Sequence, residues 1–284
     1  MIEIDIRKKL HGSMGDMELH IDLDIDEFEF VAVGGESGSG KTTLLRVLAG
    51  LESCSGDIVV HGEVWQSAQK RVPTQHREIG FVFQEYALFA NMSVEQNLLY
   101  VTRDKKMADK LLEMSGLSQL KDRLPHTLSG GQQQRVSLCR AFMGSPKLLL
   151  MDEPLSALDP TMRDRLQHDI SRLHREFGTT TIMVSHDPSE IYRLASRMLL
   201  MDQGEIIKDA TPKEILLQSD GSQKFSFKGE ILEILRADII YIAIVSIGQQ
   251  IVEVVIDEAE SRELNVGDSV TISTKAFAPS ISKI

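Results

Sequence analysis

The sequence predicts an α/β fold, interrupted by an all-helical segment and followed by a small all-β domain. First, the apolar run FEFVAV (28–33) ends in glycines and leads into helical periodicity at 42–49, which is a strand, loop and helix unit. Second, KLLLMD (147–152) and TTIMVS (180–185) are continuous apolar or β-branched runs, typical of parallel strands buried on both faces. Third, short β-type segments separated by turn residues occupy 227–284.

Strand patterns precede the helical segment. Residues 1–10 alternate apolar and charged side chains, which predicts an edge strand. DIVVHGEVW (57–65) predicts a hairpin that turns at Gly62, and IGFVF (79–83) predicts a short buried strand. From about 94 to 143 the pattern is helical, so we expect an all-helical insertion there.

Strands and helices alternate again after the insertion. Residues 162–177 supply the crossover helix that two parallel strands require. RMLLMDQGEII (197–207) predicts two strands around a turn at Gly204, and TPKEILLQ (211–218) predicts a capped helix.

A polar stretch, QSDGSQK (218–224), marks the change from α/β to β-type patterns. No helix of any length fits the residues that follow it. We therefore predict two domains, an α/β domain at 1–221 and a small β domain at 222–284.

Composition and charge exclude some classes of protein. The 284 residues are 42% hydrophobic and 26% charged, which is ordinary for a globular protein. The net charge of -11 argues against a broad basic surface, so no nucleic-acid partner is expected. We expect neither a secretion signal nor a membrane-spanning helix, because no apolar run approaches the roughly 20 residues that a span needs. Cys54 and Cys139 fit no metal or disulfide spacing and indicate a reducing cytosol.

The segment GESGSGKT (35–42) matches a phosphate-binding loop, placed after a strand and before a helix. Its glycines allow backbone N–H groups to turn toward a β-phosphate, Lys41 reaches the β- and γ-phosphates, and the Thr42 hydroxyl ligates Mg²⁺. The residues predicted to contact the nucleotide here are Gly35, Glu36, Ser37, Gly38, Ser39, Gly40, Lys41, Thr42 and Thr43.

Two carboxylates follow the buried strand of LLLMDEP (148–154). Taken alone, such a pair is usually a solvated turn, but ligands of open α/β sheets bind at the carboxyl ends of strands, where the phosphate loop also lies. Asp152 is predicted to hold Mg²⁺ through water, and Glu153 to polarise the attacking water as a general base.

Two polar residues at other strand ends complete this set. Gln84 follows IGFVF and has an amide oxygen that can reach Mg²⁺ or its water. His186 follows TIMVS and can donate a hydrogen bond to the γ-phosphate. A parallel sheet would bring both strand ends to one edge.

A second glycine-rich turn, LSGGQQQR (128–135), lies nearly a hundred residues after the first. It has the character of a helix N-terminus that receives an anion. The first loop is already complete, so the second has no evident phosphate of its own chain to hold.

The order of these motifs, with SALD at 156–159 between LLLMDEP and His186, resembles the nucleotide-binding subunit of ATP-binding cassette (ABC) transporters. The motifs span 35–186, and the flanking pattern extends the match to about 217. The resemblance implies a P-loop NTPase fold with a helical subdomain at about 85–147, ATP and Mg²⁺ as cofactors, and ATP hydrolysis coupled to transport.

In that family two subunits pair head to tail around two ATP molecules, so the resemblance implies a homodimer. The signature turn would contact the γ-phosphate held by the partner subunit's Lys41, and Asp159 would help to link the two sites. The signature residues in this sequence are Ser129, Gly130, Gly131 and Gln132.

The resemblance also implies further partners and a location. This chain would lie at the cytoplasmic face of the inner membrane, where the helical subdomain would dock the two transmembrane permease subunits. The permease would work with a solute-binding protein. The alternative class is an ABC ATPase of DNA repair or translation. Such proteins usually carry a long coiled-coil insertion or two cassettes in one chain, and this sequence has neither.

The C-terminal residues resemble the small regulatory β-barrel (OB/TOBE- or Mop-like) of oxyanion importers, especially of the molybdate type. VGDSVTISTKAFAPSI (266–281) is similar to its final strands, whose lysine, here Lys275, helps to bind the anion. Aligning KG at 228 and 229 puts Ser222 and Lys224 where that family has a serine and an arginine. The acidic stretch DEAESRE (257–263) stands where an anion site would need hydroxyls and amides. A purely structural barrel, and a transported sulfate, iron, polyamine or sugar, remain alternatives.

One departure from the family concerns the adenine base. The family usually has a stacking aromatic side chain about 29 residues before the loop lysine, and this sequence has His11, Gly12 and Ser13 there. Either His11 stacks on the base, or it lies on a solvated hairpin turn.

Overall fold

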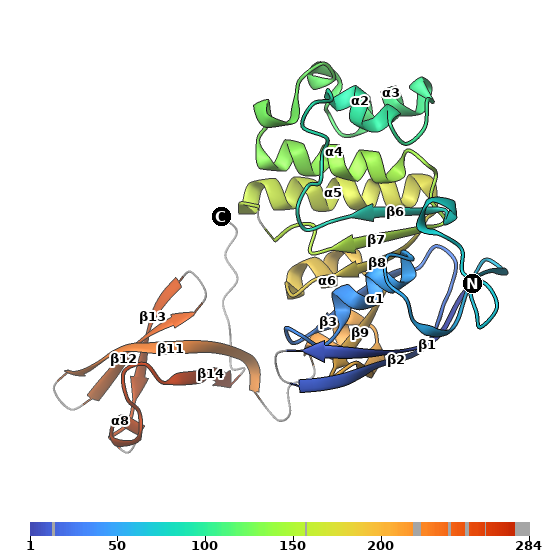
Figure 1. The fold of residues 1–284 in the computed structure, drawn as a ribbon. Helices are drawn as coiled ribbons and strands as arrows, with labels where there is room; N and C mark the ends of the chain where they lie inside the picture. Colours follow the sequence, from blue (N-terminus) through green and yellow to red (C-terminus); the bar gives the residue numbers. More distant parts are fainter. Residues whose placement is uncertain are drawn as a thin grey trace. The chain divides into compact units, whose positions relative to one another are not determined.

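The chain divides into two compact units, Met1–Leu216 and Leu217–Ile284. The computed structural model describes residues 1–12, 15–156, 158–217, 223–237, 240–247, 250–258 and 260–275 (Figure 1). The predicted domain boundary between 221 and 222 lies outside the described residues. What each domain does remains a prediction.

A six-stranded, mostly parallel sheet forms the centre of the first unit. Its strand order is β10-β9-β3-β8-β7-β6, and only β10 runs antiparallel to its neighbour. The strands are β3 (Phe30–Gly35), β6 (Ile79–Val82), β7 (Leu148–Asp152), β8 (Thr180–Val184), β9 (Arg197–Asp202) and β10 (Glu205–Ala210). The continuous apolar runs at 147–152 and 180–185 are central strands because both of their faces are covered. The α/β fold class is therefore confirmed.

A second, antiparallel sheet has the order β2-β1-β4-β5. Its strands are β1 (Ile2–Gly12), β2 (Gly15–Ile25), β4 (Ser55–Val60) and β5 (Glu63–Gln66). The expectation of an N-terminal edge strand is wrong, because β1 pairs with both β2 and β4. The alternate apolar residues of β1 are buried in a core shared with the helix α1 (Lys41–Leu48) and one face of the six-stranded sheet.

Helices cover the other face of the six-stranded sheet. The helices that follow α1 in this unit are α2 (Val94–Leu99), α3 (Lys105–Met114), α4 (Gly130–Phe142), α5 (Pro160–Phe177), α6 (Pro188–Leu194) and α7 (Pro212–Leu217), with short 3₁₀ turns η1 (Thr74–His76), η2 (Ser118–Leu120) and η3 (Pro125–Thr127). Figure 1 shows α4 between the α2–α3 pair and α5, and their apolar faces form one core with β6 and β7. The predicted helical insertion is thus present. No helix within the described ranges is both long and apolar enough to span a bilayer.

The second unit is a four-stranded antiparallel sheet of order β13-β12-β11-β14. Its strands are β11 (Gln223–Ala237), β12 (Ile240–Ile247), β13 (Gln250–Ile256) and β14 (Ser269–Lys275). One short helix, α8 (Glu260–Glu263), departs from the all-β expectation. It forms because the Asp257 carboxylate accepts from the Glu260 amide at 2.8 Å while the Glu260 carboxylate accepts from the Asp257 amide at 2.9 Å. The predicted small β fold after the α/β unit is confirmed.

Candidate active site

The phosphate-binding loop joins β3 to α1 at the carboxyl edge of the six-stranded sheet. Its first glycine, Gly35, has a φ of 138°, and a Cβ there would lie 2.1 Å from the carbonyl oxygen of Met201. No other residue fits that contact, because both the backbone angle and the neighbouring strand exclude a side chain. Within the loop the Ser39 amide donates to the Glu36 carbonyl at 3.2 Å, which closes the turn ahead of α1.

Lys41 lies folded against this loop. Its ammonium donates to the carbonyl oxygens of Gly35 at 2.8 Å and Glu36 at 2.5 Å, and to the Ser39 hydroxyl at 3.3 Å. Burial lowers the pKa of Lys41, and the nearby carboxylates of Glu153 and Asp152 oppose that shift. These neutral acceptors leave the positive charge uncompensated at short range, so an anionic phosphate would be a better partner for it.

Asp152 and Thr42 meet where β7 ends beside α1. The Thr42 hydroxyl donates to Asp152 Oδ1 at 3.2 Å. Burial raises the pKa of Asp152, the Thr42 hydrogen bond opposes this shift, and the Glu153 charge adds to it. The pair presents two hard oxygens next to a phosphate loop, the ligand type that Mg²⁺ takes together with nucleotide phosphates. The donors therefore fit the predicted ion.

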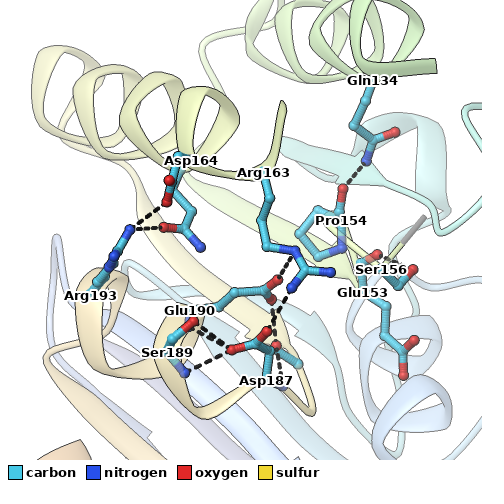
Figure 2. Close-up of polar contacts among 12 residues, drawn as sticks. Gln134, Glu153, Pro154, Ser156, Arg163, Asp164, Asp187, Ser189, Glu190 and Arg193 are labelled. Atoms are coloured by element: carbon cyan, nitrogen blue, oxygen red, sulfur yellow. Dashed lines mark hydrogen bonds and ion pairs between the residues drawn. The ribbon is translucent and has the colours of Figure 1, made fainter. Parts of the chain in front are cut away.

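Glu153 occupies a left-handed backbone position with a φ of 45°. Its amide donates to the Val184 carbonyl of β8 at 3.0 Å, and its own carbonyl accepts from the Ser156 hydroxyl at 3.0 Å (Figure 2). Its carboxylate lies 3.5 Å from Nδ1 of His186, whose side chain is 66% exposed. The predicted general base and the predicted γ-phosphate donor are thus neighbours, each at the end of its own strand.

Half of the predicted residues line one cavity of 460 Å³. These lining residues are Gly35, Ser37, Gly38, Gly40, Lys41, Thr42, Thr43, Glu153 and His186. The cavity is large enough for a nucleotide-sized ligand. The structure therefore brings the loop, the base and the histidine together around one space.

Leu10 and Met17 also line this cavity, and the sequence did not indicate them. They come from the hairpin of β1 and β2, and both lie over Gly40, because a Cβ there would meet their side chains at 3.7 and 3.5 Å. The sequence could have indicated them only through a predicted hairpin in which Leu10 pairs with Met17, and the structure has this pairing. The side chain of His11 lies outside the described part of the chain, so its stacking stays a prediction.

Gln84 and Asp159 are not among the described residues that line the cavity. Gln84 is exposed beyond the end of β6, the edge strand farthest from β3 on that side. Asp159 caps α5, because its carboxylate accepts from the Met162 amide at 3.0 Å. Their predicted roles at a closed, paired site stay predictions.

The second glycine-rich turn starts α4. Ser129 and Gln132 form a capping box, in which the Ser129 hydroxyl accepts from the Gln132 amide at 3.4 Å and the Gln132 side chain accepts from the Ser129 amide at 3.0 Å. A Cβ on Gly131 would lie 2.7 Å from Sδ of Met162, so packing against α5 favours glycine there. Gly130 lies against Tyr86 in the same way. Among the described residues, none of this turn lines the cavity of its own chain.

Comparisons with known proteins agree with this geometry. Residues 19–156 match the family model described as "ABC transporter". An iron(III) import ATP-binding protein of Rhizobium meliloti is 47% identical over 69% of this chain and 51% of its own length. A sulfate/thiosulfate import ATP-binding protein of Pseudomonas putida is 43% identical over 74% of this chain and 67% of its own. A molybdenum import ATP-binding protein of Azotobacter vinelandii is 40% identical over 76% of this chain and 62% of its own.

The chain thus spans between half and two thirds of the length of these curated relatives. Among solved structures, a bacterial ABC transporter cassette described as dimeric has a TM-score of 0.64 at 27% identity, covering 75% of this chain and 99% of that one. A subunit of an ABC transporter complex from Clostridium perfringens has a TM-score of 0.66 at 27% identity, covering 76% of this chain and 90% of that one.

Proposed function

Because this chain belongs to the ABC transporter family of ATP-binding proteins, we propose that it hydrolyses ATP to drive solute import. One observation carries the proposal. A phosphate loop, a carboxylate and a histidine line one cavity of 460 Å³, and they follow the ends of neighbouring strands. That combination suits the transfer of a γ-phosphoryl group to water, since such catalysis depends on positioning and on stabilising charge.

The charged and polar residues in and beside the cavity have distinct roles in this proposal. The loop amides and Lys41 would hold the β- and γ-phosphates. Thr42 and, through water, Asp152 would hold Mg²⁺, which would supply positive charge near the phosphate oxygens. The Glu153 carboxylate takes a proton from the attacking water, and His186 donates a hydrogen bond to the γ-phosphate.

Gln84 would approach the phosphates when ATP closes the site. The pocket lining offers Leu10 and Met17 as apolar contacts near the loop, which suit an adenosine.

A direct test measures phosphate release from MgATP by the purified full chain. Lys41→Ala should lose hydrolysis, because the loop then lacks its cation. Lys70→Ala is a matched control, since Lys70 is exposed and does not line the cavity. Equal activity in the wild type and Lys41→Ala would contradict the proposed site.

We propose that the active form is a head-to-tail homodimer. The signature turn is a helix start whose first residue, Ser129, is exposed, and none of its described residues lines the cavity of its own chain. Pairing two copies would bring Ser129, Gly130, Gly131 and Gln132 of one chain to the γ-phosphate of the other, with Asp159 at the contact between them. The dimeric cassette among the structural relatives supports this proposal.

The membrane partners would be two permease subunits, fed by a solute-binding protein, with this chain peripheral on the cytoplasmic face. A hollow of 660 Å³ on the helical block is lined by apolar, polar and basic side chains, which suits docking of a partner helix. The lining includes Leu99, and Tyr100 there is 63% exposed. Tyr100→Asp should release the chain from membranes of cells that contain the permease, without lowering the ATP affinity of the isolated chain. Unchanged membrane retention would contradict this docking surface.

For the solute we propose molybdate or another oxyanion. Relatives named as importers of iron, sulfate, molybdenum and polyamines are similarly distant, so the support comes from the likeness of the C-terminal unit to oxyanion-binding modules. Ser222 and the side chains of Lys224 and Lys275 lie outside the described part of the structure. A thermal-shift assay of the full chain with molybdate, tungstate, sulfate and phosphate tests this proposal. A melting temperature that none of the four anions shifts would remove the reason to favour molybdate.

A further inference from the structure

A small cluster of charged side chains adjoins the Glu153 and His186 pair. These two residues line the 460 Å³ cavity and also a second hollow of 20 Å³. The second hollow is also lined by Arg163 from α5, and by Asp187 and Glu190, which follow His186 in the chain. The roles proposed above do not use these three charged residues.

Arg163 joins α5 to the segment that carries His186. Its Nη1 donates to Asp187 Oδ2 at 3.0 Å, and its Nε lies 3.5 Å from Glu190 Oε1 (Figure 2). The segment is tied internally as well, because the Ser185 hydroxyl donates to Glu190 at 2.7 Å and accepts from the Asp187 amide at 3.1 Å. Residues on both sides of His186 are therefore held by one network that ends at Arg163.

The network is costly to bury. The Glu190 side chain is only 4% exposed, and burial raises its pKa while Ser185 and Arg163 oppose that shift. A buried ion pair is seldom a net source of stability compared with apolar packing, although removing one partner is strongly destabilising. The network contributes a fixed geometry more than stability, because buried charges with specific partners allow the segment few alternative conformations.

His186 depends on this support. Within the described ranges, the recorded polar contact of its side chain is the 3.5 Å approach to Glu153, and the side chain is largely exposed. Because the ring is 66% exposed, its position depends mainly on the backbone of 185–187. A histidine displaced by about 1 Å can lose much of its effect on a transferred phosphoryl group.

We propose that Arg163 is a positioning residue, which holds His186 beside Glu153 by joining Asp187 and Glu190 to α5. The inference rests on the proposed function. Arg163 lies one helical turn after Asp159, the cap of α5 that we place at the contact between two subunits. Movement of α5 on pairing would therefore change the position of His186 in the same chain.

The test compares Arg163→Ala and Arg163→Lys with Arg165→Ala. Arg165 is exposed on the same helix and provides a matched loss of charge. Arg163→Ala should lower kcat about tenfold with ATP affinity within about twofold, because binding precedes the step that needs His186. Arg163→Lys should lower kcat less than Arg163→Ala does, since the lysine ammonium keeps the positive charge but lacks the forked N–H donors of the guanidinium. Arg165→Ala should match the wild type.

A double-mutant cycle separates positioning from general support. In a His186→Ala background, Arg163→Ala should change kcat by less than about twofold, since the group it positions is gone. A second full tenfold loss in that background would overturn the proposal, as would a wild-type kcat for Arg163→Ala. If Arg163→Ala folds poorly, Glu190→Gln keeps the size of the side chain, and the same loss and the same cycle are expected.

Hydrogen exchange gives a readout without turnover. Peptides covering 185–190 should exchange faster in Arg163→Ala than in the wild type or Arg165→Ala, because the segment loses its tie to α5. Unchanged exchange there would overturn the positioning role even in an active enzyme. A wild type that releases no phosphate would instead refute the proposed function, and the exchange result would still report on Arg163.

Discussion

The head-to-tail arrangement predicts that two inactive variants regain activity when they are mixed. Ser129→Arg places a long cation at the exposed start of α4, and Lys41→Ala removes the cation of the phosphate loop. A mixed dimer contains one site with both defects and one site with neither. Only an arrangement in which each site uses two chains has this property.

The magnitudes follow from the structure. Ser129 does not line the cavity of its own chain, so Ser129→Arg should keep ATP affinity within about twofold while hydrolysis falls by about 100-fold or more. Loss of the capping serine costs about 1 kcal/mol, which lowers the melting temperature by about 2–4 °C in a unit of this size. Ser93→Arg is the matched control, because Ser93 and Gln96 form the same capping box at α2. It should show the melting shift and full hydrolysis.

The assay is phosphate release from an equal mixture of the two inactive variants after subunit exchange. Random pairing makes about half of the dimers mixed, each with one complete site, so independent sites would restore about a quarter of wild-type turnover. Cooperating sites would restore less. Differently tagged subunits that purify together without any recovered turnover would refute the reasoning.

Three other predictions test separate parts of the site. Glu153→Gln should abolish hydrolysis but retain ATP and give a dimeric elution profile in saturating ATP; a monomeric profile would count against the paired site. Gly35→Ala should prevent soluble expression because its Cβ would lie 2.1 Å from the Met201 carbonyl, whereas Gly38→Ala, whose Cβ meets nothing within 4 Å, should fold with only the strain of a φ of 85°. Burial raises the pKa of Asp152 above its unfolded value, so the ionised form costs folding free energy at neutral pH and the cost disappears as pH falls below both pKa values. Asp152→Asn should therefore raise the melting temperature at pH 7, by about 2–4 °C for each kcal/mol relieved, with little gain in acid; an equal gain at both pH values would contradict this cause.

The parts of the site that the sequence predicted are those set by local geometry. A glycine-rich turn between a strand and a helix specifies the loop around Lys41, and a charged pair after an apolar strand specifies Asp152 and Glu153. His186 was predicted because parallel strands align their carboxyl ends, and the order of β3, β8 and β7 brings it to the cavity.

The parts that the sequence missed depend on contacts between distant segments. Leu10 and Met17 reach the cavity only because β1 and β2 form a hairpin that lies over Gly40. The alternating apolar and charged residues 1–10 predicted an edge strand, but β1 pairs with a strand on each side, β2 and β4. Arg163 lies on a helix with many charged residues, so the sequence does not single it out. Its partner Asp187 is 24 residues further along the chain and meets it only in the folded structure.

The capping box at Ser129 explains how one turn can serve both the fold and a partner subunit. Within its own chain, the Ser129 oxygen accepts from the Gln132 amide, and the Gln132 side chain accepts from the Ser129 amide. A serine hydroxyl still has its proton to donate. The first amides of α4, at Gly130 and Gly131, have no acceptor inside the helix either. Within one chain a second phosphate-binding turn would be redundant. In a head-to-tail dimer, these remaining donors would form half of a site whose phosphate is held by the other copy.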